Sequence, residues 1–379
     1  MNDERNFVVE RKTGHAFCVL RLIPYVAGFL FFILFSYSAS QVFAQKQALT
    51  GPGNPDSMLV DDQQAEILYN KAIDWYDGDH FDSAIQAFNK ALQLKPDFLK
   101  ALYNRGFIRY KLEDYPGALE DFNKAIEISP TARAYFGRGL TRYALGAKEE
   151  ALEDYNSAIA LEPNNPKAFY YRGGIHYENG EYELAVDDYT RAIMLKNDFA
   201  YVYNDRGSAY QKLNHPEKAL NDYYKATLLN PALYFAFNDL GGIKMQLGDY
   251  EGAVADFTAS VKVNPNYYIA FNNRGMARFF LEDYEASIED FSKALEINDK
   301  YLPALNNRGN AKYKLKNYAG AVIDYDAVIG QDPNSADTFL NRGISKEMLR
   351  DKGGACADWQ KAADLGSEMA KEYLGSCKK

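Results

Sequence analysis

The chain has 379 residues, of which 47% are hydrophobic and 25% are charged, and its net charge is −9. This length and balance predict a folded chain with two domains or one long repeat array. Because an acidic chain repels phosphate groups, the charge argues against DNA, RNA and anionic lipid surfaces as main partners.

The first feature along the chain is an apolar stretch over residues 22–40, which holds no charged side chain. Its most apolar part, YVAGFLFFILF, has the length of a signal-peptide core rather than of a membrane span. Val42 and Ala44 then stand at the small-residue positions that a signal peptidase needs. We predict that residues 1–44 are a signal peptide, with an uncleaved inner-membrane anchor over residues 22–41 as the alternative. Either way, the rest of the chain is expected outside the cytoplasm, in the periplasm or envelope.

A short segment over residues 45–64, QKQALTGPGNPDSMLVDDQQ, follows this leader. It holds two glycines and two prolines and shows no hydrophobic period. Such a composition is typical of a flexible linker.

The sequence from residue 65 to residue 369 repeats itself nine times. The phrase Asn-Arg-Gly and its variants recur, and the small residue of the phrase defines a glycine position that advances by 34 residues, with one step of 33. Two further positions of the repeat hold small residues in nearly every copy, with an aromatic residue between them. Most repeats end with a proline. Apolar residues at spacings of three and four predict two helices per repeat, and the small residues let those helices cross closely. The glycine position falls at Ala72, Gly106, Gly139, Gly173, Gly207, Gly241, Gly275, Gly309 and Gly343.

These columns resemble the tetratricopeptide repeat family over residues 65–369. The resemblance implies an all-α fold, a right-handed superhelical solenoid of about nine helical hairpins. The first helix of each repeat would line a concave groove, and residues 370–379 would form a C-terminal cap. In this frame the glycine of Asn-Arg-Gly is a helix-crossing position and not part of a catalytic or phosphate-binding loop.

Two charged columns run through the repeats. An arginine precedes the glycine position in seven repeats, and an aspartate stands sixteen residues after that site in eight repeats. The first repeat lacks both, whereas the sixth keeps Asp256 although Leu240 replaces its arginine. We expect semi-buried Arg–Asp pairs within repeats, because a buried guanidinium needs a partner; two independently solvated columns are the alternative. The arginines are Arg105, Arg138, Arg172, Arg206, Arg274, Arg308 and Arg342.

Four positions of each repeat are expected to face the groove, as the resemblance implies: three and two residues before the glycine position, and one and four residues after it. The first groove column, three residues before the glycine position, reads Tyr69, Tyr103, Phe136, Tyr170, Asn204, Asn238, Asn272, Asn306 and Leu340. The second groove column, two residues before it, reads Asn70, Asn104, Gly137, Tyr171, Asp205, Asp239, Asn273, Asn307 and Asn341.

The asparagines of both columns form the first candidate binding site. Neighbouring hairpins lie about 9–10 Å apart and an extended peptide advances about 3.3 Å per residue, so one amide per repeat meets every third residue. An amide both donates and accepts, so it can bind a peptide backbone. The alternative is that these amides satisfy helix ends and neighbouring repeats. The candidates are Asn204, Asn238, Asn272, Asn306, Asn273, Asn307 and Asn341.

The aromatic half of the first groove column is the second candidate site. Tyr69, Tyr103, Phe136 and Tyr170 would hold a glycan or a lipid chain, or would serve only to pack neighbouring repeats. No lysine stands in the first groove column, so the family's carboxylate clamp for acidic C-termini is not expected.

Other chemistry is sparse. The four histidines show no metal-ligand spacing, and we predict no catalytic residue, metal or cofactor. Cys356 and Cys377 are the two cysteines after the leader; they would form a disulfide that fixes the cap, or two buried free thiols. The sequence therefore predicts a non-catalytic scaffold for a protein or an extended peptide. The alternative is an accessory module for a glycan or lipid, and a membrane is expected only through an uncleaved leader.

Overall fold

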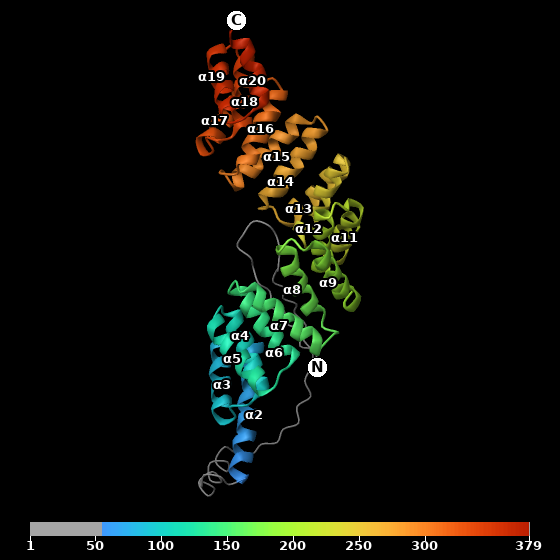
Figure 1. The fold of residues 1–379 in the computed structure, drawn as a ribbon, viewed down its shortest axis with the longest axis vertical. Helices are drawn as coiled ribbons and strands as arrows, with labels where there is room; N and C mark the ends of the chain where they lie inside the picture. The colour runs from blue at the N-terminus through green and yellow to red at the C-terminus, as the bar shows by residue number, and fades with distance from the viewer. Residues whose placement is uncertain (1–54, 379) are drawn as a thin grey trace. The chain divides into compact units, whose positions relative to one another are not determined.

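The computed structural model describes residues 55–378 (Figure 1), so the predicted leader over residues 1–44 lies outside the described residues. Within residues 55–378 every regular element is helical, with α-helices α2 to α20 and one short 3-10 helix, and no strand. The predicted all-α class is therefore confirmed. None of the helices in this range combines the length and apolar content that a membrane crossing requires.

The helices form nine consecutive hairpins, each a first helix followed by a second helix that packs against it. The first helices are α2 (Pro55–Asp77), α4 (Leu99–Lys111), α6 (Ala132–Ala144), α8 (Pro166–Glu178), α10 (Ala200–Lys212), α12 (Tyr234–Gln246), α14 (Tyr268–Phe280), α16 (Leu302–Lys314) and α18 (Ala336–Met348). The second helices are α3 (Phe81–Leu94), α5 (Tyr115–Ile128), α7 (Lys148–Leu161), α9 (Tyr182–Leu195), α11 (Pro216–Leu229), α13 (Tyr250–Val263), α15 (Tyr284–Ile297), α17 (Tyr318–Gln331) and α19 (Lys352–Asp364).

The described chain divides into two compact parts after Asn197. We call residues 55–197 the N-terminal block and residues 198–378 the C-terminal block. Inside each block, successive helices pack against each other in chain order, so both blocks have the helix-pair packing of a repeat solenoid (Figure 1).

The glycine positions are points of close helix crossing, as predicted. A Cβ atom added at Gly207 would lie 2.9 Å from Cε1 of Tyr223, and one at Gly275 would lie 2.7 Å from Cε1 of Phe291. Both rings are buried on the second helix of the same repeat. A larger residue at a glycine position would therefore push the two helices apart.

The turn inside each hairpin places one residue in the left-handed backbone region. Glycine holds this place at Gly146, Gly180 and Gly248, where φ is 80–82°. Six other repeats use a residue with a side chain, such as Glu113 (φ 63°) or Glu282 (φ 62°). Because this conformation crowds a Cβ atom, the six turns carry a modest strain.

The linker predicted over residues 45–64 is partly wrong. Helix α2 begins at Pro55, so residues 55–64 are helical, and residues 45–54 lie outside the described range. Proline is compatible with the first turn of a helix because its missing N–H has no partner there anyway. Asp62 of this extension lies 3.3 Å from Nζ of Lys95, which ties the helix to its own hairpin.

The C-terminal cap is helix α20 (Glu368–Leu374) followed by the 3-10 helix η1 (Gly375–Lys378), so it begins two residues before the predicted boundary. Ala370 is fully buried, and the ring of Tyr373 lies 5.0 Å from that of Trp359. Cys356 and Cys377 are joined by a disulfide with an S–S distance of 2.03 Å. The cap is thereby attached to the second helix of the ninth repeat both covalently and by packing.

Candidate functional site

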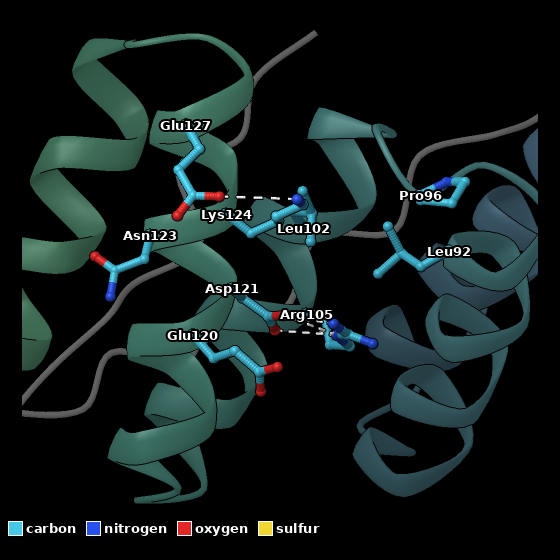
Figure 2. A pocket seen from close by; sticks show the side chains of 9 residues that line it. All are labelled: Leu92, Pro96, Leu102, Arg105, Glu120, Asp121, Asn123, Lys124 and Glu127. Atoms are coloured by element: carbon cyan, nitrogen blue, oxygen red, sulfur yellow. Dashed lines mark hydrogen bonds and ion pairs between the residues drawn. The ribbon is translucent and has the colours of Figure 1, made fainter.

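The Arg–Asp pairs predicted between the two helices of a repeat are confirmed. In all seven repeats that carry the arginine, a guanidinium nitrogen lies 2.5–2.7 Å from the aspartate sixteen residues later. Figure 2 shows the pair of Arg105 and Asp121. Asp121 is 1% exposed, and its burial raises the pKa of that carboxyl, while Arg105 opposes the rise. These pairs belong to the fold and carry no chemistry.

A second cation, which the sequence analysis missed, reaches the same aspartates. It stands three residues after the glycine position and lies 2.7–3.0 Å from the carboxylate in six repeats. Lys244 fills this place in the sixth repeat, so Asp256 is paired although Leu240 replaces its arginine. A signal existed in the sequence, because this position lies four residues, one helical turn, after the arginine. The cations are Arg109, Arg142, Lys244, Arg278, Lys312 and Lys346.

The arginines also connect neighbouring repeats, which the prediction of pairing within a repeat did not include. Nη1 of Arg105 donates to Oδ1 of Asn89 on the preceding second helix at 2.6 Å, and Nη1 of Arg138 donates to Asn123 at 2.9 Å. The same contact recurs from Arg274, Arg308 and Arg342. Each of these side chains therefore holds two hairpins together.

A hollow of about 410 Å³ lies between helices α3, α4 and α5. Figure 2 shows the side chains that line it. Its charged lining is already used by the fold, because Arg105 pairs with Asp121 and Lys124 lies 3.7 Å from Glu127. Asn123 accepts a hydrogen bond from the next repeat. The hollow is best explained by hairpin packing, and it is not our candidate site.

The asparagines of the first groove column are mostly buried. Asn204, Asn238 and Asn272 are 2%, 9% and 5% exposed, while Asn306 is half-buried. Each takes part in a side-chain hydrogen bond; Asn306, for example, accepts from Thr338 of the next repeat at 3.4 Å. The three buried amides expose little surface to an extended peptide, and their hydrogen bonds support the alternative role between repeats.

The second groove column supplies partners for these amides. Asn273 donates to Oδ1 of Asn238 at 3.0 Å, and Asn307 donates to Oδ1 of Asn272 at 3.0 Å. Asn341 donates to Asn310 at 3.4 Å. All three donors are half-buried and not fully enclosed, so this column keeps some contact with solvent.

The amide hydrogen bonds of the C-terminal block converge on one carboxylate, that of Asp239. Asn272 donates to Asn273, Asn273 donates to Asn238, and Asn238 donates to Oδ1 of Asp239 at 3.3 Å. From the preceding repeat, Nδ2 of Asn204 donates to Oδ2 of Asp239, also at 3.3 Å. The donors in this series all point toward Asp239, so they stabilise its negative charge cooperatively.

Asp239 is nevertheless a carboxylate without a cation. Among the described residues, no lysine, arginine or histidine forms an ion pair with it. The aspartates sixteen residues after each arginine site, which we call the acid column, all pair with cations. Burial raises the pKa of Asp239 to about 6, while the amides of Asn238 and Asn204 oppose the rise. Oδ1 of Asn204 is a buried acceptor with no hydrogen-bond partner in the described part of the chain.

Open space lies on the same helix face, one turn after Asp239. Gly242 stands three residues later, at a position that the family resemblance places in the groove, and a Cβ atom added there would meet no atom within 4 Å. The site therefore combines a charged acceptor, an unused neutral acceptor and room for a ligand. From the sequence, Asp239 is recognisable only as a member of the second groove column, because its lack of a cation depends on tertiary contacts.

The aromatic half of the first groove column serves packing in the N-terminal block. Tyr103, Phe136 and Tyr170 are only 7%, 9% and 5% exposed. The hydroxyl of Tyr103 hydrogen-bonds Oγ1 of Thr131 at 2.8 Å, and Asn104 donates to the hydroxyl of Tyr69 at 3.0 Å. These rings leave little surface for a glycan or a lipid chain, so inter-repeat packing is the better explanation.

No group of histidine, cysteine, aspartate and glutamate side chains within residues 55–378 is arranged to hold a metal ion.

Comparison with protein families assigns most of the repeats. Models described as TPR repeat match residues 139–180 and 173–214. Models described as tetratricopeptide repeat match residues 77–135, 200–233, 236–267, 268–301 and 302–335. Among curated proteins, none matches the chain.

Solved structures with the same fold come from several sources. A tetratricopeptide repeat protein from Parabacteroides merdae is 23% identical, with 65% of this chain and 99% of that chain covered and a TM-score of 0.50. The C-terminal part of a TPR repeat-containing protein from Cytophaga hutchinsonii is 16% identical over 63% of this chain and 98% of its own, with a TM-score of 0.51. The Cut9–Hcn1 hetero-tetramer of APC/C is 16% identical over 90% and 82%, also at 0.51. At these identities the likeness shows the fold alone.

Proposed function

Because the chain belongs to the tetratricopeptide repeat family, we propose that it is a non-catalytic scaffold that binds a protein or an extended peptide through the groove of its first helices. The observation that supports the proposal is the site at Asp239, where, within residues 55–378, a carboxylate lacks a cation and a neighbouring amide oxygen lacks a donor. The aspartates sixteen residues after each arginine site are paired with cations. In contrast, Asp239 has no cation among the described residues, and Oδ1 of Asn204 has no donor there. A partner that supplies donors would relieve this deficit.

We place this binding outside the cytoplasm, in the periplasm or envelope. Two features support the location. The apolar stretch over residues 22–40 has the pattern of a leader, and the disulfide between Cys356 and Cys377 fits an oxidising compartment.

The experiment is a pull-down from envelope extracts with the full-length chain as bait. The test variant is Gly242→Leu, which fills the open space beside Asp239 and keeps every charge. The matched control is Gly330→Leu on α17, because Gly330 is likewise a helical glycine with nothing within 4 Å of an added Cβ atom. Both changes suit a helix, since leucine has a higher helix propensity than glycine.

A groove scaffold predicts a protein band that the wild type and Gly330→Leu capture and Gly242→Leu loses. A band that all three baits capture equally would place the interface elsewhere and overturn the proposal. The location is tested separately by fractionation: recovery of the chain with cytoplasmic markers, with both cysteines reduced, would reject it.

A further inference from the structure

We infer that the groove of the C-terminal block recognises a cationic side chain, lysine or arginine, of an extended partner segment, with Asp239 as the residue that binds the charge. The inference rests on the proposed function and names the chemistry of its partner. It follows from four properties of the site.

The first property is the missing counter-charge. The acid column shows what this chain does with buried carboxylates, since Asp290 and Asp324 each contact two cations at 2.6–2.9 Å. Asp239 has only two amide donors at 3.3 Å. A carboxylate offers about four acceptor sites, so a further donor can be accommodated.

The second property is the orphaned acceptor. Asn204 is 2% exposed, and its Nδ2 atom donates to Asp239. Its Oδ1 atom, on the same amide, accepts nothing in the described chain. The amide cannot simply be reversed, because its oxygen would then face the carboxylate. A carboxylate without a cation, beside an acceptor without a donor, fits a group that carries several N–H donors and a positive charge.

The third property is selectivity against an anion or a neutral apolar group. An acidic ligand would be repelled by Asp239, and an apolar group would bury the carboxylate without a hydrogen bond. The net charge of −9 also favours the approach of a basic segment.

The fourth property is access. Asp239 is half-buried and not enclosed, and Gly242 leaves open space one turn away. The fifth and seventh repeats have Ser208 and Met276 at the corresponding position, so the sixth repeat has the smallest residue of the three. An extended chain crossing these repeats could therefore place a long side chain against α12.

The test uses a positional-scanning library of N-acetylated nonapeptides, in which one position is fixed and the others are mixed. Acetylation excludes the peptide amino terminus as the source of the charge. The bait is the full-length chain as wild type, Asp239→Asn, or Asp299→Asn. Asp299 is an exposed residue of the same block, so its variant removes the same charge away from the groove. Unchanged circular dichroism would show that the variants are folded.

We expect pools with lysine or arginine fixed at one central position to bind the wild type and Asp299→Asn alike. Asp239→Asn should weaken the binding of those pools by about tenfold to a hundredfold, as for a desolvated charge pair. Individual peptides from the best pool, with the fixed residue as lysine, arginine or methionine, then identify which cation is preferred. Gly242→Leu should weaken the lysine or arginine peptide as strongly as Asp239→Asn does.

Two results would overturn the inference while leaving the scaffold function intact: selected pools without a basic residue, or basic pools that bind Asp239→Asn as well as the wild type. If no pool bound the wild type while the pull-down still captured a protein lost in Gly242→Leu, the partner would present a folded surface and not an extended cationic segment. If the pull-down also captured no protein that Gly242→Leu loses, the proposed binding function of the groove would be rejected.

Discussion

The two blocks of this chain build the same groove column from opposite chemistry. In the N-terminal block the column is aromatic, and Tyr103, Phe136 and Tyr170 are satisfied by packing with few hydrogen bonds. In the C-terminal block it is asparagine, and each buried amide must find partners on the next repeat. A column of packed rings needs no hydrogen-bond partner at its last member. A series of amides that donate to one another needs an acceptor at its last member.

This difference indicates where a binding site can form in a repeat array. The amide series ends at Asp239, a carboxylate with no cation and a raised pKa. An unfavourable charge that the fold retains is a common property of binding sites. In the N-terminal block, by contrast, the buried carboxylates of Asp121, Asp154 and Asp188 each lie 2.5–2.7 Å from an arginine nitrogen.

The largest expected effect is on the pH dependence of stability. The pKa of Asp239 is about 6 in the folded chain against 3.8 for the ordinary group. Since the folded state holds the proton more tightly, this residue opposes folding fully above pH 6, and its cost disappears as the pH falls toward 4. Relative to Asp239→Asn, the wild type should gain about 2.5 kcal/mol of unfolding free energy between pH 8 and pH 4. Urea denaturation at both pH values measures the difference, and a constant offset would contradict the raised pKa.

Breaking the amide column comes next. Asn272→Ala removes the acceptor of Asn307 and the donor to Asn273. We expect the unfolding free energy to fall by about 2 kcal/mol, because the half-buried amides of Asn307 and Asn273 each lose a hydrogen-bond partner. The exposed Asn334 provides the control, since Asn334→Ala should change stability by less than about 0.5 kcal/mol. Equal effects of the two substitutions would mean that the column is not structural.

The aromatic column should respond more weakly to the loss of a polar group. Tyr103→Phe removes only the hydroxyl contact with Thr131 and leaves the ring in place. We expect a loss of about 1 kcal/mol in chemical denaturation. A loss as large as that of Asn272→Ala would erase the distinction between the two columns.

The smallest effect tests what the blocks share. Glu113 in the N-terminal block and Glu282 in the C-terminal block both have a positive φ in their hairpin turns. Replacing either with glycine relieves the crowding of its Cβ atom, and each change should stabilise its block by a few tenths to about 1 kcal/mol. Thermal denaturation of both variants measures this, and opposite signs would show that the two turns differ in more than sequence.

Much of the architecture could be predicted from the sequence, because the repeats act as an internal alignment. The first repeat lacks both the arginine and the aspartate, and this joint absence is enough to indicate that the two residues pair. The second cation was harder to find, since His176 and Tyr210 interrupt its column. The start of α2 was missed because Gly51, Pro52 and Gly53, shortly before Pro55, are typical of a linker.

The orientation of the groove asparagines could not be predicted in the same way. Whether an amide at a groove position faces the ligand or the next repeat depends on how closely adjacent first helices approach. The repeat pattern does not specify that spacing. The same holds for Asp239, whose neighbours at 3.3 Å come from two different repeats.

Leu240 affects how strongly its repeat is coupled to the preceding repeat. At the next three junctions an arginine reaches back to the preceding hairpin, through Thr258, Ser292 and Asp326. Leu240 cannot make that contact, and the residue at the accepting place, Tyr224, is 55% exposed. In a linear array of nearest-neighbour couplings, one weak coupling sets where the array separates into independently melting segments. Within the C-terminal block, the rate of amide hydrogen exchange should therefore differ between α11 and α12, next to Asp239.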